Sequence, residues 1–110
     1  MNYELLKIKN ELAKIKNVTD NAYAIIRQSD IDESFSWLEV ITHQFTASVT
    51  YDCGFDLIVR YSNGEIDEYT LRTGCYLELD EVVNKISNCV EIFCVNSHIL
   101  EKVAINSVPS

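Results

Sequence analysis

The chain has 110 residues, of which 47% are hydrophobic and 24% charged, and its formal net charge is −8. This length and apolar content suit one folded domain, 1–110, and exclude a disordered chain. The negative charge argues against direct binding to nucleic acid or to a membrane surface, since both are anionic.

The charge is unevenly spread along the chain. Residues 1–17 carry four lysines against two glutamates, a balance of +2, whereas residues 18–110 carry fifteen acids against five bases, a balance of −10. No apolar stretch resembling a signal peptide follows the first residues, and the longest apolar run, 22–26, is too short to cross a bilayer. We therefore expect a cytoplasmic protein whose four cysteines stay reduced.

The first expected element is a basic amphipathic helix over residues 3–16. Its apolar side chains recur at intervals of three and four residues, which places them on one helix face; they are Leu5, Ile8, Leu12 and Ile15. Two heptads are too short for a freestanding coiled coil. The face therefore packs either on its own domain or on a second copy, and in the second case these four residues form a homodimer interface.

Residues 17–20 read as a break, after which 22–26 suits either a short helix or a strand. The segment from Ser29 to Glu33 is typical of a helix N-terminus, because Asp30 can cap and Glu33 follows three residues later. An apolar stripe of helical spacing follows, so the sequence predicts a helix over 31–42.

Apolar and polar side chains then alternate over 45–51 and again over 55–61, which is the period of a β-strand. A three-residue loop between these runs, with Gly54 in the left-handed conformation, pairs Tyr51 with Phe55. All the apolar side chains of both strands then share one face.

The next turn, at 62–64, permits two registers. A two-residue Asn-Gly turn puts Arg60 opposite Asp67, whereas a three-residue loop puts Leu57 opposite Tyr69. A shift of one residue exchanges the faces of a strand. We prefer the three-residue loop, because it keeps the apolar face continuous, and we expect a third strand over 65–72.

The C-terminal part is predicted to be a helix followed by a hairpin. Four apolar residues, at 79, 82, 83 and 86, share one helix face, with two acids in the first turn where they favour the helix dipole. Two strands, 89–95 and 99–105, are then expected. The predicted fold is α+β, in which N-terminal helices pack on a mostly antiparallel sheet made of a three-stranded meander, a helix and a C-terminal hairpin.

The candidate partner-binding residues are two acidic groups about ten residues apart, with tyrosines between them. They are Glu65, Asp67 and Glu68 on the third strand, Tyr69 next to them, and Glu78, Asp80 and Glu81 at the start of the last helix. Tyrosine and an exposed negative charge suit the docking of a basic protein. The alternative is a solvated face that keeps a small domain soluble.

No pattern for catalysis, metal binding or cofactor binding stands out. His43 and His98 are the only histidines, and His98 lies four residues from Cys94 but across a predicted turn. The cysteine spacings match no zinc site, and the calcium-binding and phosphate-binding loops are absent. We therefore expect no catalytic residue, no metal and no cofactor.

In size and charge the chain is similar to the small acidic inhibitors of phages and mobile elements, which include nucleic-acid mimics and anti-CRISPR proteins. This resemblance implies a non-enzymatic protein that captures or blocks a basic partner, such as a nucleic-acid-processing enzyme. The alternative is a structural or assembly subunit that oligomerises through its N-terminal helix.

Overall fold

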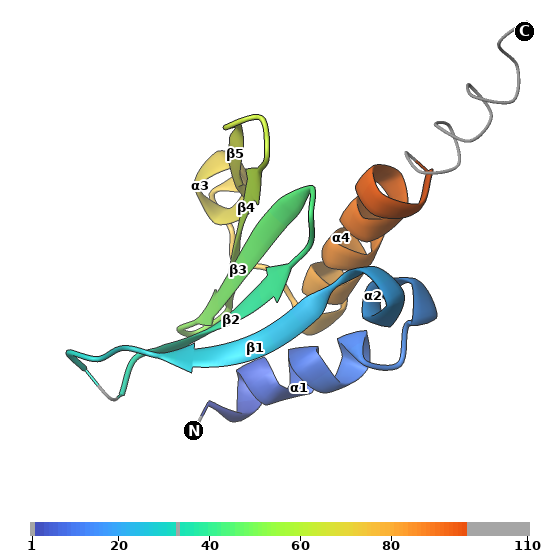
Figure 1. The fold of residues 1–110 in the computed structure, drawn as a ribbon. Coiled ribbons are helices and arrows are strands. Elements are labelled where there is room, and N and C mark those ends of the chain that lie inside the picture. The colour runs from blue at the N-terminus through green and yellow to red at the C-terminus, as the bar shows by residue number, and fades with distance from the viewer. Residues whose placement is uncertain (1, 33, 97–110) are drawn as a thin grey trace, which may run out of the picture.

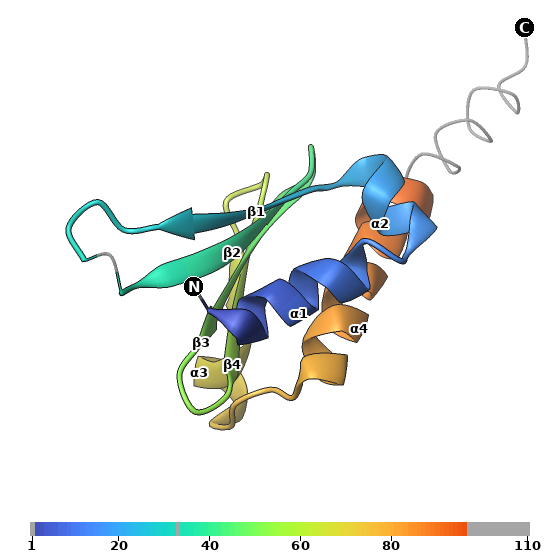
Figure 2. The same cartoon turned by 90° about the horizontal axis from the view of Figure 1, so that it is seen from below.

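The computed structural model describes residues 2–32 and 34–96. Five strands form one antiparallel sheet in the order β1-β2-β3-β4-β5. They are β1 (Tyr23–Gln28), β2 (Ser36–Ile41), β3 (Phe45–Tyr51), β4 (Phe55–Tyr61) and β5 (Ile66–Glu68). The two long helices, α1 (Tyr3–Leu12) and α4 (Leu79–Val90), lie side by side against one face of the sheet (Figure 1 and Figure 2). The chain is thus α+β with an antiparallel sheet, as predicted.

The β3–β4 hairpin has the predicted register, since Tyr51 lies opposite Phe55 and Val49 opposite Leu57. Alternate side chains of both strands are buried, and these form the centre of the core. The left-handed residue of the loop is Cys53, with φ of 65°, and not Gly54 as expected. Gly54 is needed for another reason, because the side chain of Tyr76 packs directly against its backbone.

The β4–β5 pairing follows the preferred register, with Ile58 opposite Glu68 and Val59 opposite Asp67. The expected strand 65–72 is too long, however. Pairing stops at Glu68, and α3 (Tyr69–Thr73) turns the chain away until it ends at the left-handed Gly74.

The predicted helix over 31–42 is wrong, because β2 occupies half of that range and pairs with strands on both sides. Leu38 and Val40 are fully buried at a spacing of two, so burial follows the strand period. A turn forms before β2 instead of a helix, and Ser29, not the expected Asp30, accepts backbone N–H groups there. The Ser29 hydroxyl accepts the backbone N–H of Ile31 and of Asp32, each at 3.2 Å.

The N-terminal helix is shorter than expected. It begins at Tyr3, where the Asn2 side chain accepts two backbone N–H groups, and it ends at Leu12. The chain turns and starts the short helix α2 (Lys16–Asn21) after Ile15. Of the two alternatives for 22–26, the structure has the strand, β1.

The predicted strand 89–95 is also wrong. The buried face of α4 runs on through Ile86 to Val90, and the chain continues as a π-helical segment, η1 (Glu91–Asn96). The apolar residues at 86, 89, 90 and 93 follow the spacing of a helix face, and the helical conformation continues from α4 into η1. The predicted strand 99–105 lies outside the described residues. No helix in 2–32 and 34–96 is long and apolar enough to cross a membrane.

Candidate partner-binding site

A hollow of about 470 Å³ lies at one end of the sheet, between the β4–β5 turn and η1. Its walls are made by Tyr61, Asn63, Glu65, Ile66, Asp67 and Phe93. Two of the predicted partner-binding residues, Glu65 and Asp67, are therefore brought together with two aromatic rings. The third predicted acid of this group, Glu68, is exposed at the end of β5.

The two aromatic rings that line the hollow pack against each other and against Phe45 of the core. The rings of Tyr61 and Phe93 lie 5.1 Å apart, centroid to centroid, and are tilted by 56°. The buried ring of Phe45 lies 6.4 Å from Tyr61 and 6.5 Å from Phe93, within the range of favourable aromatic contacts. Phe45 thus fixes both rings, while Phe93 keeps 38% of its surface exposed.

The electrostatic surroundings of the hollow are negative. Burial raises the pKa of Tyr61 to about 12, and the nearby Cys89, Asp67 and Glu65 contribute in the same direction. Burial disfavours any charge at this place, whereas the smaller contributions of Asp67 and Glu65 disfavour only an anion and favour a cation. Arg72 compensates part of this charge, since its Nε lies 3.1 Å from Asp67 Oδ1, but Glu65 has no ion-pair partner among the described residues.

Tyr69 does not serve as the surface anchor that the sequence suggested. Its side chain is only 9% exposed, because it starts α3 and turns inward. Two cations cover its ring, with Arg72 Cζ at 4.9 Å and Lys85 Nζ at 4.6 Å from the centroid. Burial also raises the pKa of this phenol above its ordinary value, so it remains a neutral packing residue.

The second acidic group serves mainly to start α4. Glu78 and Glu81 form a capping box, in which each side chain accepts a backbone N–H from the other end of the first turn. Asp80 is the member of this group left exposed without a hydrogen bond or ion pair in the described part of the chain.

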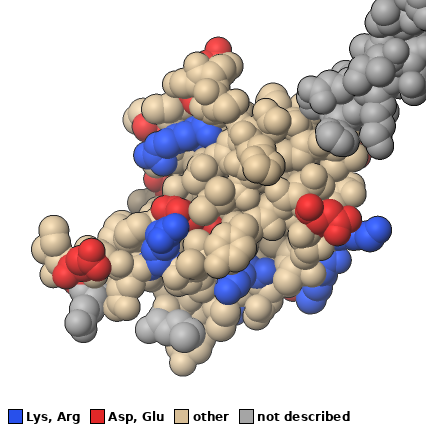
Figure 3. Space-filling model, viewed as in Figure 1, with Lys and Arg blue, Asp and Glu red and all other residues tan. Residues whose placement is uncertain are grey.

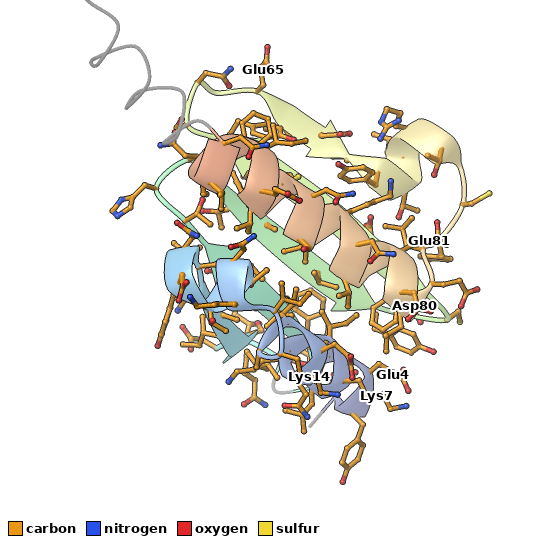
Figure 4. The ribbon with its side chains drawn as sticks, turned by 90° about the vertical axis from the view of Figure 1, so that its right-hand side faces the viewer. Glu4, Lys7, Lys14, Glu65, Asp80 and Glu81 are labelled. Carbon is orange, nitrogen blue, oxygen red and sulfur yellow. The ribbon has the colours of Figure 1, made fainter. Side chains whose placement is uncertain are left out.

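The two acidic groups do not form one continuous surface. Figure 4 shows Glu65 near one end of α4, and Asp80 and Glu81 at the other. On the face shown in Figure 3, acidic side chains stand at separate places, with lysines and arginines between several of them. Of the two groups, the one at the β4–β5 turn is accompanied by an aromatic hollow.

The expected homodimer interface is covered within the chain itself. Leu5, Ile8 and Leu12 are at most 1% exposed and belong to the core beneath α1, while Ile15 packs against its margin. α1 contacts α4 and the first three strands. These side chains already have partners, so nothing in the structure favours assembly through this helix.

In residues 2–32 and 34–96, no three or more His, Cys, Asp or Glu side chains lie close enough to hold a metal ion. The four cysteines are free, with Cys53 and Cys75 exposed and Cys89 buried. Burial raises the pKa of the Cys89 thiol, which disfavours the reactive thiolate.

Sequence reasoning missed Phe93, because it assigned that residue to a strand. The signal that would have found it is the helical continuation of the α4 apolar face, which brings 93 back to the same side as 86 and 89. No protein-family model, curated protein or solved structure matches this chain.

Proposed function

We propose that this chain is a small acidic binding protein, without catalytic activity of its own, that captures or blocks a basic protein partner. The observation that carries this proposal is the surplus of carboxylates that have no ion pair within the described part of the chain. They are Asp30, Asp32, Asp52, Asp56, Glu65, Glu68, Glu78, Asp80, Glu81 and Glu91.

Most of the described lysine and arginine side chains are already paired with acidic side chains of the same chain. Five ion pairs engage Lys7, Lys14, Lys16, Arg27 and Arg72. Only Lys9, Arg60 and Lys85 have no ion pair among residues 2–32 and 34–96, and Lys85 lies over the Tyr69 ring. The uncompensated charge is therefore anionic, which accelerates the approach of a basic partner.

Exposed apolar side chains accompany the acids, as they do in protein interfaces. Ile66 is 58% exposed beside the β4–β5 hollow, and Leu71 and Tyr76 are exposed on the neighbouring segment. A negatively charged surface with apolar contacts is suited to a cationic groove that normally receives phosphates. The blocking of a nucleic-acid-processing enzyme is accordingly the form of activity that we propose.

The test is affinity capture from the native cell, read by mass spectrometry, with the wild type and a charge-reversed variant. The variant carries Glu65→Lys, Glu68→Lys and Asp80→Lys, because these side chains have no structural partner. Asp67 and Glu81 are left intact, since one pairs with Arg72 and the other caps α4.

We expect the wild type to capture a basic protein that is released by salt, since exposed charges are screened within about 8–10 Å at ordinary ionic strength. The reversed variant should not retain it. A control reverses Asp30, Asp52 and Glu91, which gives the same net charge but leaves the predicted partner-binding acids unchanged, so it should still capture the partner. Capture that survives both high salt and charge reversal would contradict the proposal.

A further inference from the structure

Building on the proposed function, we infer that the hollow beside Tyr61 receives an arginine side chain of the basic partner. The guanidinium stacks against the rings of Tyr61 and Phe93 and pairs with the carboxylate of Glu65, next to Asp67, which Arg72 already holds. The hollow, which combines aromatic walls with an acidic rim, is the part of this surface that has the chemistry of a specific pocket.

The dimensions of the hollow suit such a guest. Its volume of about 470 Å³ lies within the roughly 300–1,000 Å³ of typical ligand pockets. Its two rings are packed against the buried ring of Phe45. A preformed pocket spares the partner part of the entropy cost of ordering an interface.

The charges in and around the hollow select a cation. The carboxylates of Glu65 and Asp67 both line the hollow, beside the rings of Tyr61 and Phe93. The negative face of an aromatic ring also attracts cations, most strongly where water is partly excluded. An anionic or purely apolar guest would leave the Glu65 carboxylate desolvated without compensation.

The protein already contains an arginine bound between a tyrosine ring and a carboxylate, at β5 and α3 next to the hollow. Arg72 places its guanidinium carbon 4.9 Å from the centre of the Tyr69 ring, and its Nε binds Asp67 at 3.1 Å. That internal group joins an arginine, a tyrosine and a carboxylate of β5. The neighbouring hollow offers a tyrosine and a carboxylate without the arginine, which a partner would supply.

Arginine fits these walls better than lysine does. The guanidinium is planar, so it stacks on a ring and donates two parallel hydrogen bonds to a carboxylate, whereas the ammonium group of lysine is a compact, strongly hydrated charge. We therefore expect the protein to bind an arginine peptide more tightly than a lysine peptide of equal charge.

The experiment measures the affinity of an oligoarginine peptide and of an oligolysine peptide of equal length, by calorimetry at low and moderate salt. Two variants alter the hollow, Phe93→Leu and Glu65→Gln. Two matched controls make the same chemical changes elsewhere, Phe35→Leu on an exposed ring and Asp30→Asn on an exposed side chain of the β1–β2 loop. Circular dichroism verifies that each variant is folded.

We expect Phe93→Leu and Glu65→Gln each to weaken oligoarginine binding by about fivefold or more, and the controls by less than about twofold. Oligolysine should bind more weakly than oligoarginine and should be insensitive to Phe93→Leu. Equal losses in the hollow variants and the controls, or equal affinity for both peptides, would overturn the pocket and leave the proposed function standing. Failure of both peptides to bind the wild type at low salt would count against both.

Discussion

The backbone of Gly54 lies directly against the side chain of Tyr76. A methyl group on Gly54 would stand 2.4 Å from Tyr76 Cβ and 2.8 Å from its Cγ, closer than real side chains approach. The neighbouring residues Phe55 and Leu77 exchange two backbone hydrogen bonds, of 3.1 and 2.8 Å. This contact therefore fixes the segment that leads into α4 onto the end of the β3–β4 hairpin.

The first prediction follows from this contact. Gly54→Ala should lower the free energy of unfolding by about 1–3 kcal/mol, the usual cost of forcing extra atoms into a packed site. Urea denaturation at neutral pH measures it. In a Tyr76→Gly background, where the opposing Cβ is absent, the same substitution should cost much less. An undiminished cost there would attribute the loss to the loop backbone instead.

The β3–β4 hairpin could be predicted from the sequence because two independent signals agreed on it. Apolar alternation fixed the buried face, and the loop length fixed which residues face each other, such as Tyr51 and Phe55. Over 31–42 the signals conflicted, since Phe35, Leu38 and Ile41 fit a helical stripe. The deciding factor was pairing with β1 and β3, a tertiary effect that no local pattern contains.

The candidate site could be predicted in part. Glu65 and Asp67 were placed correctly beside the β4–β5 turn, because the preferred register of that hairpin was the observed one. Tyr69 was misplaced, because the sheet ends at Glu68, the residue before it, and α3 turns its side chain inward. Phe93 was missed because a run of β-branched, aromatic and cysteine residues at the end of α4 resembles a strand locally.

The second prediction concerns α1 and separates folding from assembly. Ile8 is fully buried in the core, so Ile8→Asp should unfold the chain, because a carboxylate without a partner would be buried. Far-ultraviolet circular dichroism would show the loss of structure. Tyr3→Asp, at a side chain that is 72% exposed on the same helix, is the matched control and should fold. A folded Ile8→Asp monomer obtained from a wild-type dimer would restore the assembly alternative.

The third prediction uses the single tryptophan as a reporter. Trp37 Nε1 donates a 2.9 Å hydrogen bond to Glu39 Oε1, and Arg27 Nε lies 2.8 Å from Oε2. These bonds, the first of them foremost, hold the pKa of Glu39 below its ordinary 4.5. Tryptophan fluorescence should therefore change with a midpoint below pH 4.5.

The contribution of Glu39 to stability has a defined sign. Because its pKa is lowered by folding, its stabilising effect is complete above about pH 4.5 and is lost as the pH falls through the folded value. Glu39→Gln should abolish the fluorescence transition and flatten this part of the stability profile. A midpoint at or above 4.5 in the wild type would refute the interaction.

The last prediction concerns alkaline pH and the hollow. Burial, with the help of Cys89, Asp67 and Glu65, raises the pKa of Tyr61 to about 12 from an ordinary value of 10. The unfolded chain then loses this proton first. The stabilising effect of Tyr61 is therefore complete below about pH 10 and is lost progressively as the pH rises toward 12.

Denaturation in urea at a series of pH values from neutral to strongly alkaline would measure this decline. Tyr61→Phe keeps the ring but removes the titrating hydroxyl, so its stability should fall less steeply with pH. Tyr23→Phe, at an exposed edge position, is the matched control and should follow the wild type. Parallel curves for the wild type and Tyr61→Phe would mean that folding does not raise the pKa of this hydroxyl.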